Sequence, residues 1–79
     1  MNDKTFENYI WDLNFLLKEN ALNAKAKKNA SKPEDLDYNL GYLMAYHEVI
    51  DLMKQQASAF NIKQRDIGLA DINADVDLL

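Results

Sequence analysis

The chain has no cysteine, one histidine, one proline and two glycines among its 79 residues. Without cysteine it forms neither a disulfide nor a thiolate metal site, and nothing in it indicates an oxidising compartment. A domain this small buries only roughly 60% of the surface that its unfolded chain exposes, and it is marginal alone. Because the common covalent and metal staples are excluded, the sequence points to a partner as the source of stability.

Long apolar runs are also missing. The longest, from Leu40 to Tyr46, contains a glycine and is far shorter than the ~20 residues that cross a bilayer. The start of the chain, Met1 to Lys4, is polar with mixed charge and does not resemble a signal peptide. We therefore expect no membrane partner and a cytoplasmic location.

Positive charge is in the minority, since 13 acidic residues outnumber 9 basic ones and the net charge is -4. Lys25, Lys27, Lys28 and Lys32 form a basic patch, but no aromatic group that could stack on a base lies among them. Compensation of a helix dipole and solubility explain this patch more simply. We expect no nucleic-acid partner.

Most of the chain shows helical periodicity. Apolar residues recur at intervals of three and four over 4–28, where Asp3 or Thr5 could act as the N-cap. The stripe on this first helix is Phe6, Tyr9, Ile10, Leu13, Leu16, Leu17 and Ala24. Residues 29–32 are then expected to form a loop.

A second helix is predicted over 33–60, with Ser31 and Glu34 as a capping box and Pro33 in the first turn. Its stripe is Leu36, Leu43, Tyr46, Ile50, Met53, Ala57 and Phe60. Asn61 is expected as a left-handed C-cap, followed by a short helix or turn over 62–68 that Gly68 closes and an acidic tail over 69–79. The sequence thus predicts one all-α domain over 1–79, an antiparallel two-helix hairpin.

Each predicted helix carries a second apolar face. At ~100° per residue, the second face of the first helix lies about 160–180° from Leu13. A hairpin has a single internal seam, so we expect two copies to pack into a four-helix bundle. The expected interface residues are Trp11, Phe15, Leu22, Gly41, Ala45 and Leu52. The alternative is that the C-terminal segment, with Ile62, Ile67, Leu69 and Ile72, folds back over one face within a monomer.

Two groups of side chains are candidates for ligand binding. His47 has Glu48 beside it, but Met44 occupies the position where a helical di-metal site needs glutamate, so a histidine at the edge of the core is expected. The aromatic row on the second helix is typical of an interface, although with Trp11 it could also line a pocket for a flat ligand. The possible ligand-lining residues are Tyr38, Tyr42, Tyr46 and His47.

The acidic tail spaces its oxygen donors at alternate positions, Asp71, Asn73, Asp75 and Asp77. A calcium loop needs glycine at its sixth position, where this chain has Val76. We expect a solvated tail there and no metal. With no glycine-rich loop and no nucleophile in a known setting, the sequence also predicts no catalytic residues, no cofactor and no enzyme activity.

The stretch from Gly41 to Ala57, followed by Phe60 and by Asp77-Leu78-Leu79, resembles a family of small uncharacterised helical proteins of bacteria, some found in mobile gene cassettes. The resemblance covers about half of the chain. It implies a helical, cytoplasmic bacterial protein and assigns a role to no residue.

The function expected from these patterns is that of a non-enzymatic helical module for protein interaction, working as a homodimer. One alternative is an acidic inhibitor of the antitoxin or immunity type, which binds a basic protein. Another is a small-molecule binder with an aromatic-lined pocket in the bundle.

Overall fold

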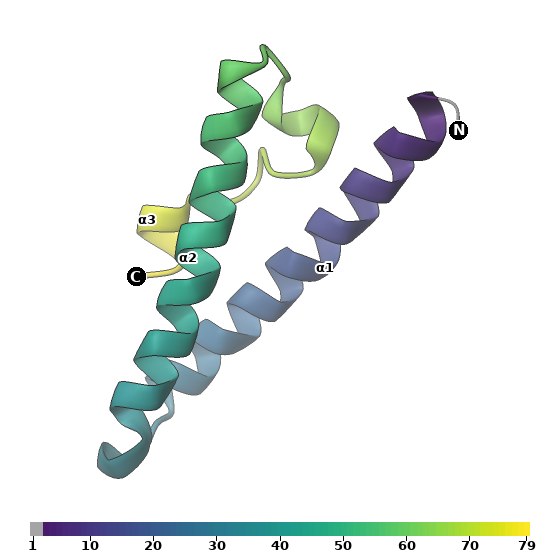
Figure 1. The fold of residues 1–79 in the computed structure, drawn as a ribbon. Coiled ribbons are helices and arrows are strands. Elements are labelled where there is room, and N and C mark those ends of the chain that lie inside the picture. The colour runs from purple at the N-terminus through teal and green to yellow at the C-terminus, as the bar shows by residue number, and fades with distance from the viewer. Residues whose placement is uncertain (1–2) are drawn as a thin grey trace.

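Two long helices dominate the computed structural model, which describes residues 3–79 (Figure 1). The helix α1 spans Asp3–Asn29 and α2 spans Leu36–Ala59, with the single 3₁₀ turn η1 (Pro33–Asp35) in the connection. A second 3₁₀ helix, η2 (Gln64–Ile67), and the short α3 (Ala74–Asp77) follow. No strand occurs in residues 3–79. The predicted all-α helical hairpin is confirmed.

The connection between the long helices uses Ser31 differently from the prediction. Its hydroxyl donates to the carbonyl oxygen of Lys27 at 2.8 Å and accepts from the Asn39 side chain at 2.7 Å. The predicted capping box is wrong, because Ser31 satisfies a free carbonyl at the end of α1 and the N-cap position before Pro33 is occupied by Lys32. Pro33 does stand in the first turn, as expected.

The start of α1 was expected to be capped by Asp3 or Thr5. The helix begins at Asp3, and the side chain of that residue lies outside the described part of the structure. Thr5 lies inside the helix and not at its end. At the other end, Lys27 and Lys28 occupy the last turn, where their charge complements the helix dipole.

Asn61 takes the predicted left-handed conformation, and Gly68 closes the following turn as predicted. Asn61 has φ 58°, and the N–H of Ile62 reaches back to the carbonyl of Ala57 at 2.7 Å, as in a Schellman motif. Gly68, at φ 75°, closes η2. These two residues turn the chain back toward the groove between the long helices.

The seam between α1 and α2 is only partly where the apolar pattern predicts it. On α2, Leu43, Ile50 and Ala57 are buried as expected. On α1 the buried side chains are Asn14, Ala21 and Ala24, while most of the predicted stripe is exposed, namely Phe6, Tyr9, Leu13 and Leu16. The contact line is rotated by about 70° from Leu13, so it runs between the two apolar faces of α1.

The C-terminal segment, residues 69–79, is folded onto the hairpin through its apolar side chains, whereas the Asp71 and Asp75 side chains of the expected solvated tail stay largely exposed. Leu69, Ile72, Ala74 and Leu78 are buried in one cluster with residues of both long helices. In Figure 1 the segment passes behind α2 and ends in α3. The C-terminal segment thus covers one face of the hairpin within the chain, as the alternative expects.

Among residues 3–79, neither long helix has an apolar stretch long enough to cross a membrane.

Candidate interaction site

The two sides of the hairpin differ in what lies on them. On one side, here called the covered side, the C-terminal segment is held by cationic side chains and His47. Lys18 on α1 pairs with Asp71 at 2.7 Å, and His47 on α2 lies 2.9 Å from the Asp75 carboxylate. Main-chain oxygens of the same segment accept hydrogen bonds from Lys25 and Lys54. Both long helices therefore bind the segment through specific polar contacts.

The ion pair with Lys18 shifts the pKa of Asp71. The hydrogen bond from Lys18 lowers this pKa below the ordinary value of 3.8, although partial burial opposes the shift. The carboxylate is therefore the favoured form of Asp71 in the folded chain, and protonating it weakens the contact with α1.

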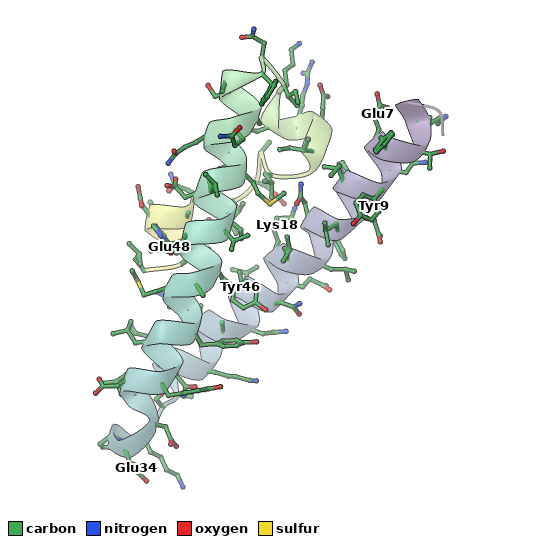
Figure 2. All side chains as sticks on the ribbon, in the orientation of Figure 1. Glu7, Tyr9, Lys18, Glu34, Tyr46 and Glu48 are labelled. Carbon is green, nitrogen blue, oxygen red and sulfur yellow. The ribbon has the colours of Figure 1, made fainter. Side chains whose placement is uncertain are left out.

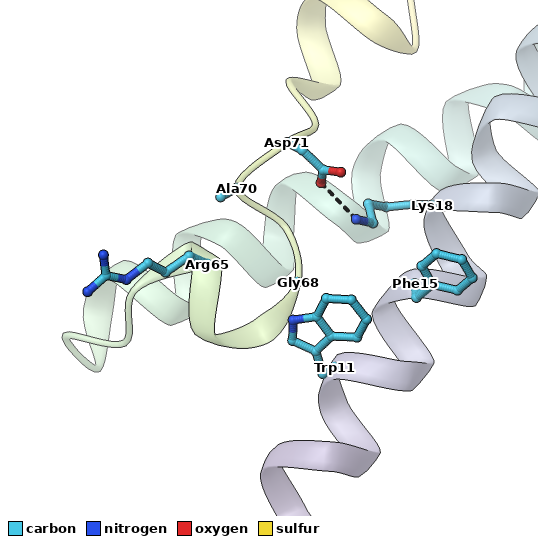
Figure 3. Close-up of a pocket in the computed structure, with 7 residues that line it drawn as sticks. All are labelled: Trp11, Phe15, Lys18, Arg65, Gly68, Ala70 and Asp71. Carbon is cyan, nitrogen blue, oxygen red and sulfur yellow. Dashed lines mark hydrogen bonds and ion pairs between the residues drawn. The ribbon is translucent and has the colours of Figure 1, made fainter.

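Trp11 lies close to the backbone of Gly68, the residue just before the C-terminal segment. A methyl group added at Gly68 would stand 3.3 Å from the Trp11 indole nitrogen, so only glycine fits without displacing the ring. Trp11 also stacks on Phe15 with ring centroids 6.2 Å apart. Figure 3 shows the open cleft of about 240 Å³ beside them, with the Lys18–Asp71 pair at its edge and the Arg65 guanidinium pointing away.

Three of the predicted interface residues thus belong to the covered side. Trp11 and Phe15 line the cleft described above, and Leu22 lines a neighbouring hollow together with Phe15 and Ile72. The second apolar face of α1, to which these three residues belong, is therefore partly covered by the C-terminal segment. These residues remain roughly half exposed, since Trp11 keeps 48% of its surface in solvent.

Asn14 is a structural residue that the sequence analysis missed. It is fully buried, and its side-chain N–H donates to the carbonyl oxygen of Ile67 at 2.6 Å, which ties α1 to η2. Its Oδ1 has no partner among the described residues, and the same is true of Nδ1 of His47. The available signal was a single amide between Leu13 and Phe15 in an apolar run.

The donors of the calcium-like pattern have other partners. Asp71 and Asp75 bind Lys18 and His47, and the Asn73 side chain caps α3 by accepting from the N–H groups of Asp75 and Val76. In the part of the chain that the structure describes, no group of three or more potential ligands is placed to hold a metal ion.

On the opposite side of the hairpin, here called the open face, no segment of residues 3–79 covers the apolar side chains. These side chains come from both long helices and the turn after α2: Leu17, Tyr42, Ala45, Val49, Leu52, Phe60 and Ile62. Val49 is 44% exposed, Leu52 56% and Phe60 71%. No charged residue belongs to this set.

Two hollows lie along the open face. The first, about 260 Å³, is lined by Leu17, Tyr42, Ala45, Tyr46 and Val49. The second, about 350 Å³, lies at the other end of α2, where Ile10, Leu52, Phe60 and Ile62 contribute to its walls. Two of the predicted interface residues, Ala45 and Leu52, are therefore on this face.

The remaining predicted residues are divided between the two sides. Gly41 is exposed on α2, and a methyl group there would point into open space. Tyr38, Tyr42 and Tyr46 form a continuous row, with centroids 6.4 Å apart for the first pair and 5.4 Å for the second. His47 lies apart from this row, on the covered side.

Tyr46 links the row to α1. Figure 2 shows it reaching from α2 toward the first helix, whereas Tyr9 points away from the rest of the fold. The hydroxyl of Tyr46 lies 3.5 Å from that of Tyr42. This hydrogen bond, together with partial burial, raises the pKa of Tyr46 above 10.0. Of the row, Tyr42 and Tyr46 line the first hollow.

No protein-family model, curated protein or solved structure matches this chain significantly. Its function is therefore argued from its own residues.

Proposed function

We propose that this protein is a non-enzymatic helical interaction module that forms a homodimer through the open face. The observation that carries the proposal is an apolar surface, drawn from two helices, that no segment of residues 3–79 covers. Exposed apolar patches rimmed by polar residues mark sites of protein interaction.

The size of the exposed surface supports a partner. The chain exposes 5728 Å², whereas a folded monomer of 9.1 kDa is expected to expose about 4,900 Å². The radius of gyration is 14.1 Å, against about 11.6 Å for a compact domain of this length. The excess of about 800 Å² equals what each partner buries in an interface of standard size.

The distribution of charge favours a second copy over a basic protein. A basic partner would need carboxylates on the surface that binds it, but no carboxylate lines either hollow of the open face, and Asp71 and Asp75 are already paired on the covered side. Two chains of net charge -4 can meet through an uncharged face while their charged groups remain in solvent.

The test compares the same substitution on the two sides. Val49→Lys places a charge in the middle of the open face, and Val76→Lys places it on α3, where the side chain is 73% exposed. Both variants change the net charge equally. Solution mass is measured by light scattering over a tenfold range of concentration, with circular dichroism to confirm the helical fold.

We expect a mass near twice 9.1 kDa for the unmodified chain and for Val76→Lys. Val49→Lys should move the mass toward that of one chain, because a buried unpaired charge is costly. A monomer at every concentration, or a dimer that Val49→Lys leaves unchanged, would contradict the proposal.

A further inference from the structure

The exposed residues of α2 contain a heptad pattern, parts of which line the two hollows of the open face. Starting at Tyr38, they follow each other at alternating intervals of four and three, which is the a/d spacing of a coiled coil. We call this row the α2 seam: Tyr38, Tyr42, Ala45, Val49, Leu52, Gln56 and Ala59. All seven residues are exposed.

The seam is distinct from the stripe that packs inside the hairpin. Leu43, Ile50 and Ala57 are buried and repeat at intervals of seven on another side of the same helix, and Leu43 and Ile50 pack in the cluster with residues of α1 and the C-terminal segment. An α-helix with two such rows can pack on neighbours along both. Residues 3–79 bury the first row and leave the second exposed.

We infer that the α2 seam pairs with the α2 seam of a second copy, antiparallel, about a twofold axis midway between Val49 and Leu52. This inference rests on the homodimer proposed above and specifies how the two copies dock. A twofold axis exchanges positions that lie at equal distances from it. Val49 then meets the partner's Leu52, Ala45 meets the partner's Gln56, and Tyr42 meets the partner's Ala59.

Side-chain volume selects this register. On each side of the axis, a large side chain faces a small one across the interface: Gln56 faces Ala45, and Tyr42 faces Ala59. A parallel pairing would oppose each residue to its own copy, so two tyrosines would meet in one layer and two alanines in another. Cores pack best when large and small residues alternate across facing positions.

The neighbouring surface fits the same arrangement. In the antiparallel register Gly41 lies at the level of the partner's Phe60, and the space beside Gly41 is open. The hollow lined by Ala45 lies next to this position along α2. Phe60 is 71% exposed within the chain and so has apolar surface to bury. The partner copy thereby contributes a side chain at the edge of a hollow that is incomplete in one chain.

The lack of native cysteine makes this geometry testable by cross-linking. Ala45→Cys and Gln56→Cys are prepared separately, mixed so that subunits exchange, and oxidised, and disulfide dimers are read on a non-reducing gel. We expect a heterodimer of the two variants and little cross-linking of either alone, because like positions would lie roughly 16 Å apart along the axis. Val76→Cys serves as the control on the covered side.

The outcomes separate the two proposals. Efficient cross-linking of Ala45→Cys with itself would indicate parallel docking and overturn the inference. A dimeric mass with no cross-link in the mixture would also overturn it, since the copies would then meet through another arrangement. Both results would leave the homodimer intact, whereas a monomeric mass would remove the homodimer itself.

A second measurement uses two adjacent glutamines. Gln56 lies on the seam, whereas Gln55 lies off it and donates to Asp51 at 2.8 Å. Gln56→Leu should lower the dimer dissociation constant about tenfold, because an apolar side chain would then face alanine across the interface. Gln55→Leu should leave it within about twofold. Equal effects from the two variants would contradict the seam.

Discussion

The covered side and the open face show two ways of dealing with an apolar helix surface. On the covered side, lysines and His47 hold acidic groups and main-chain oxygens of one particular segment. The open face offers shape and apolar area without a charged group. A surface that binds part of its own chain can use ion pairs that fix one register. A surface that pairs with a second copy about a twofold axis must be complementary to itself, and uncharged side chains allow this because no like charges meet.

The largest expected difference between the two sides concerns buried leucines. Leu69→Ala should destabilise the folded chain by about 2–5 kcal/mol, because it leaves a cavity under a fully buried side chain. Leu52→Ala, at a position 56% exposed, should change the stability of the single chain by much less and should instead raise the dissociation constant of the proposed homodimer. Urea unfolding at low concentration and light scattering measure the two effects. Similar losses of stability would remove the distinction between the sides.

A smaller effect is expected from the two glycines, with opposite signs. Gly68→Ala should cost about 1–2 kcal/mol, because the backbone there is left-handed and the new methyl group would press on Trp11. Gly41→Ala should stabilise α2 by about 0.5–1 kcal/mol, since it lies inside a helix with open space beside it. Melting temperatures of the two variants check the signs. A neutral Gly68→Ala would show that the segment does not need its close approach to Trp11.

The smallest effect should come from the ion pair on the covered side. Because the folded chain lowers the pKa of Asp71, its carboxylate stabilises the fold above the usual aspartate range, and this contribution is lost as the pH falls through the folded value. The pair is largely exposed on the aspartate side, so Asp71→Asn should cost only about 0.5 kcal/mol at neutral pH.

Unfolding of Asp71→Asn and the original chain is compared between neutral and strongly acidic pH, with Asp12→Asn as an exposed aspartate outside the segment. The difference for Asp71→Asn should vanish in acid. A difference that persists there would mean that Lys18 does not act through the carboxylate.

Local features of the fold could be predicted because they depend on neighbouring residues. Asn61 takes the predicted left-handed conformation, Gly68 closes η2, and Pro33 stands in a first helical turn. Ser31 could not be placed in this way, because it lies between two helices and its hydroxyl could cap either the end of α1 or the start of the next helix. Which end it caps depends on the path of the connection and not on spacing alone.

The packing of α1 could not be predicted from apolar periodicity. Its two apolar faces left two choices for the seam, and the helix uses neither, since Asn14, Ala21 and Ala24 face inward. Small side chains allow α1 to approach its neighbours closely. The amide of Asn14 finds its partner at Ile67, far along the chain, and no local pattern contains that information.

The sequence by itself determined that the chain is helical, where its long helices run and that each carries more apolar surface than one seam can bury. Periodicity and capping are properties of a single helix, so they can be read from neighbouring residues. Only the tertiary structure decided which apolar face the C-terminal segment covers and which stays open. That choice depends on contacts between residues more than fifty positions apart, such as Lys18 with Asp71, and such contacts exist only once the chain has folded.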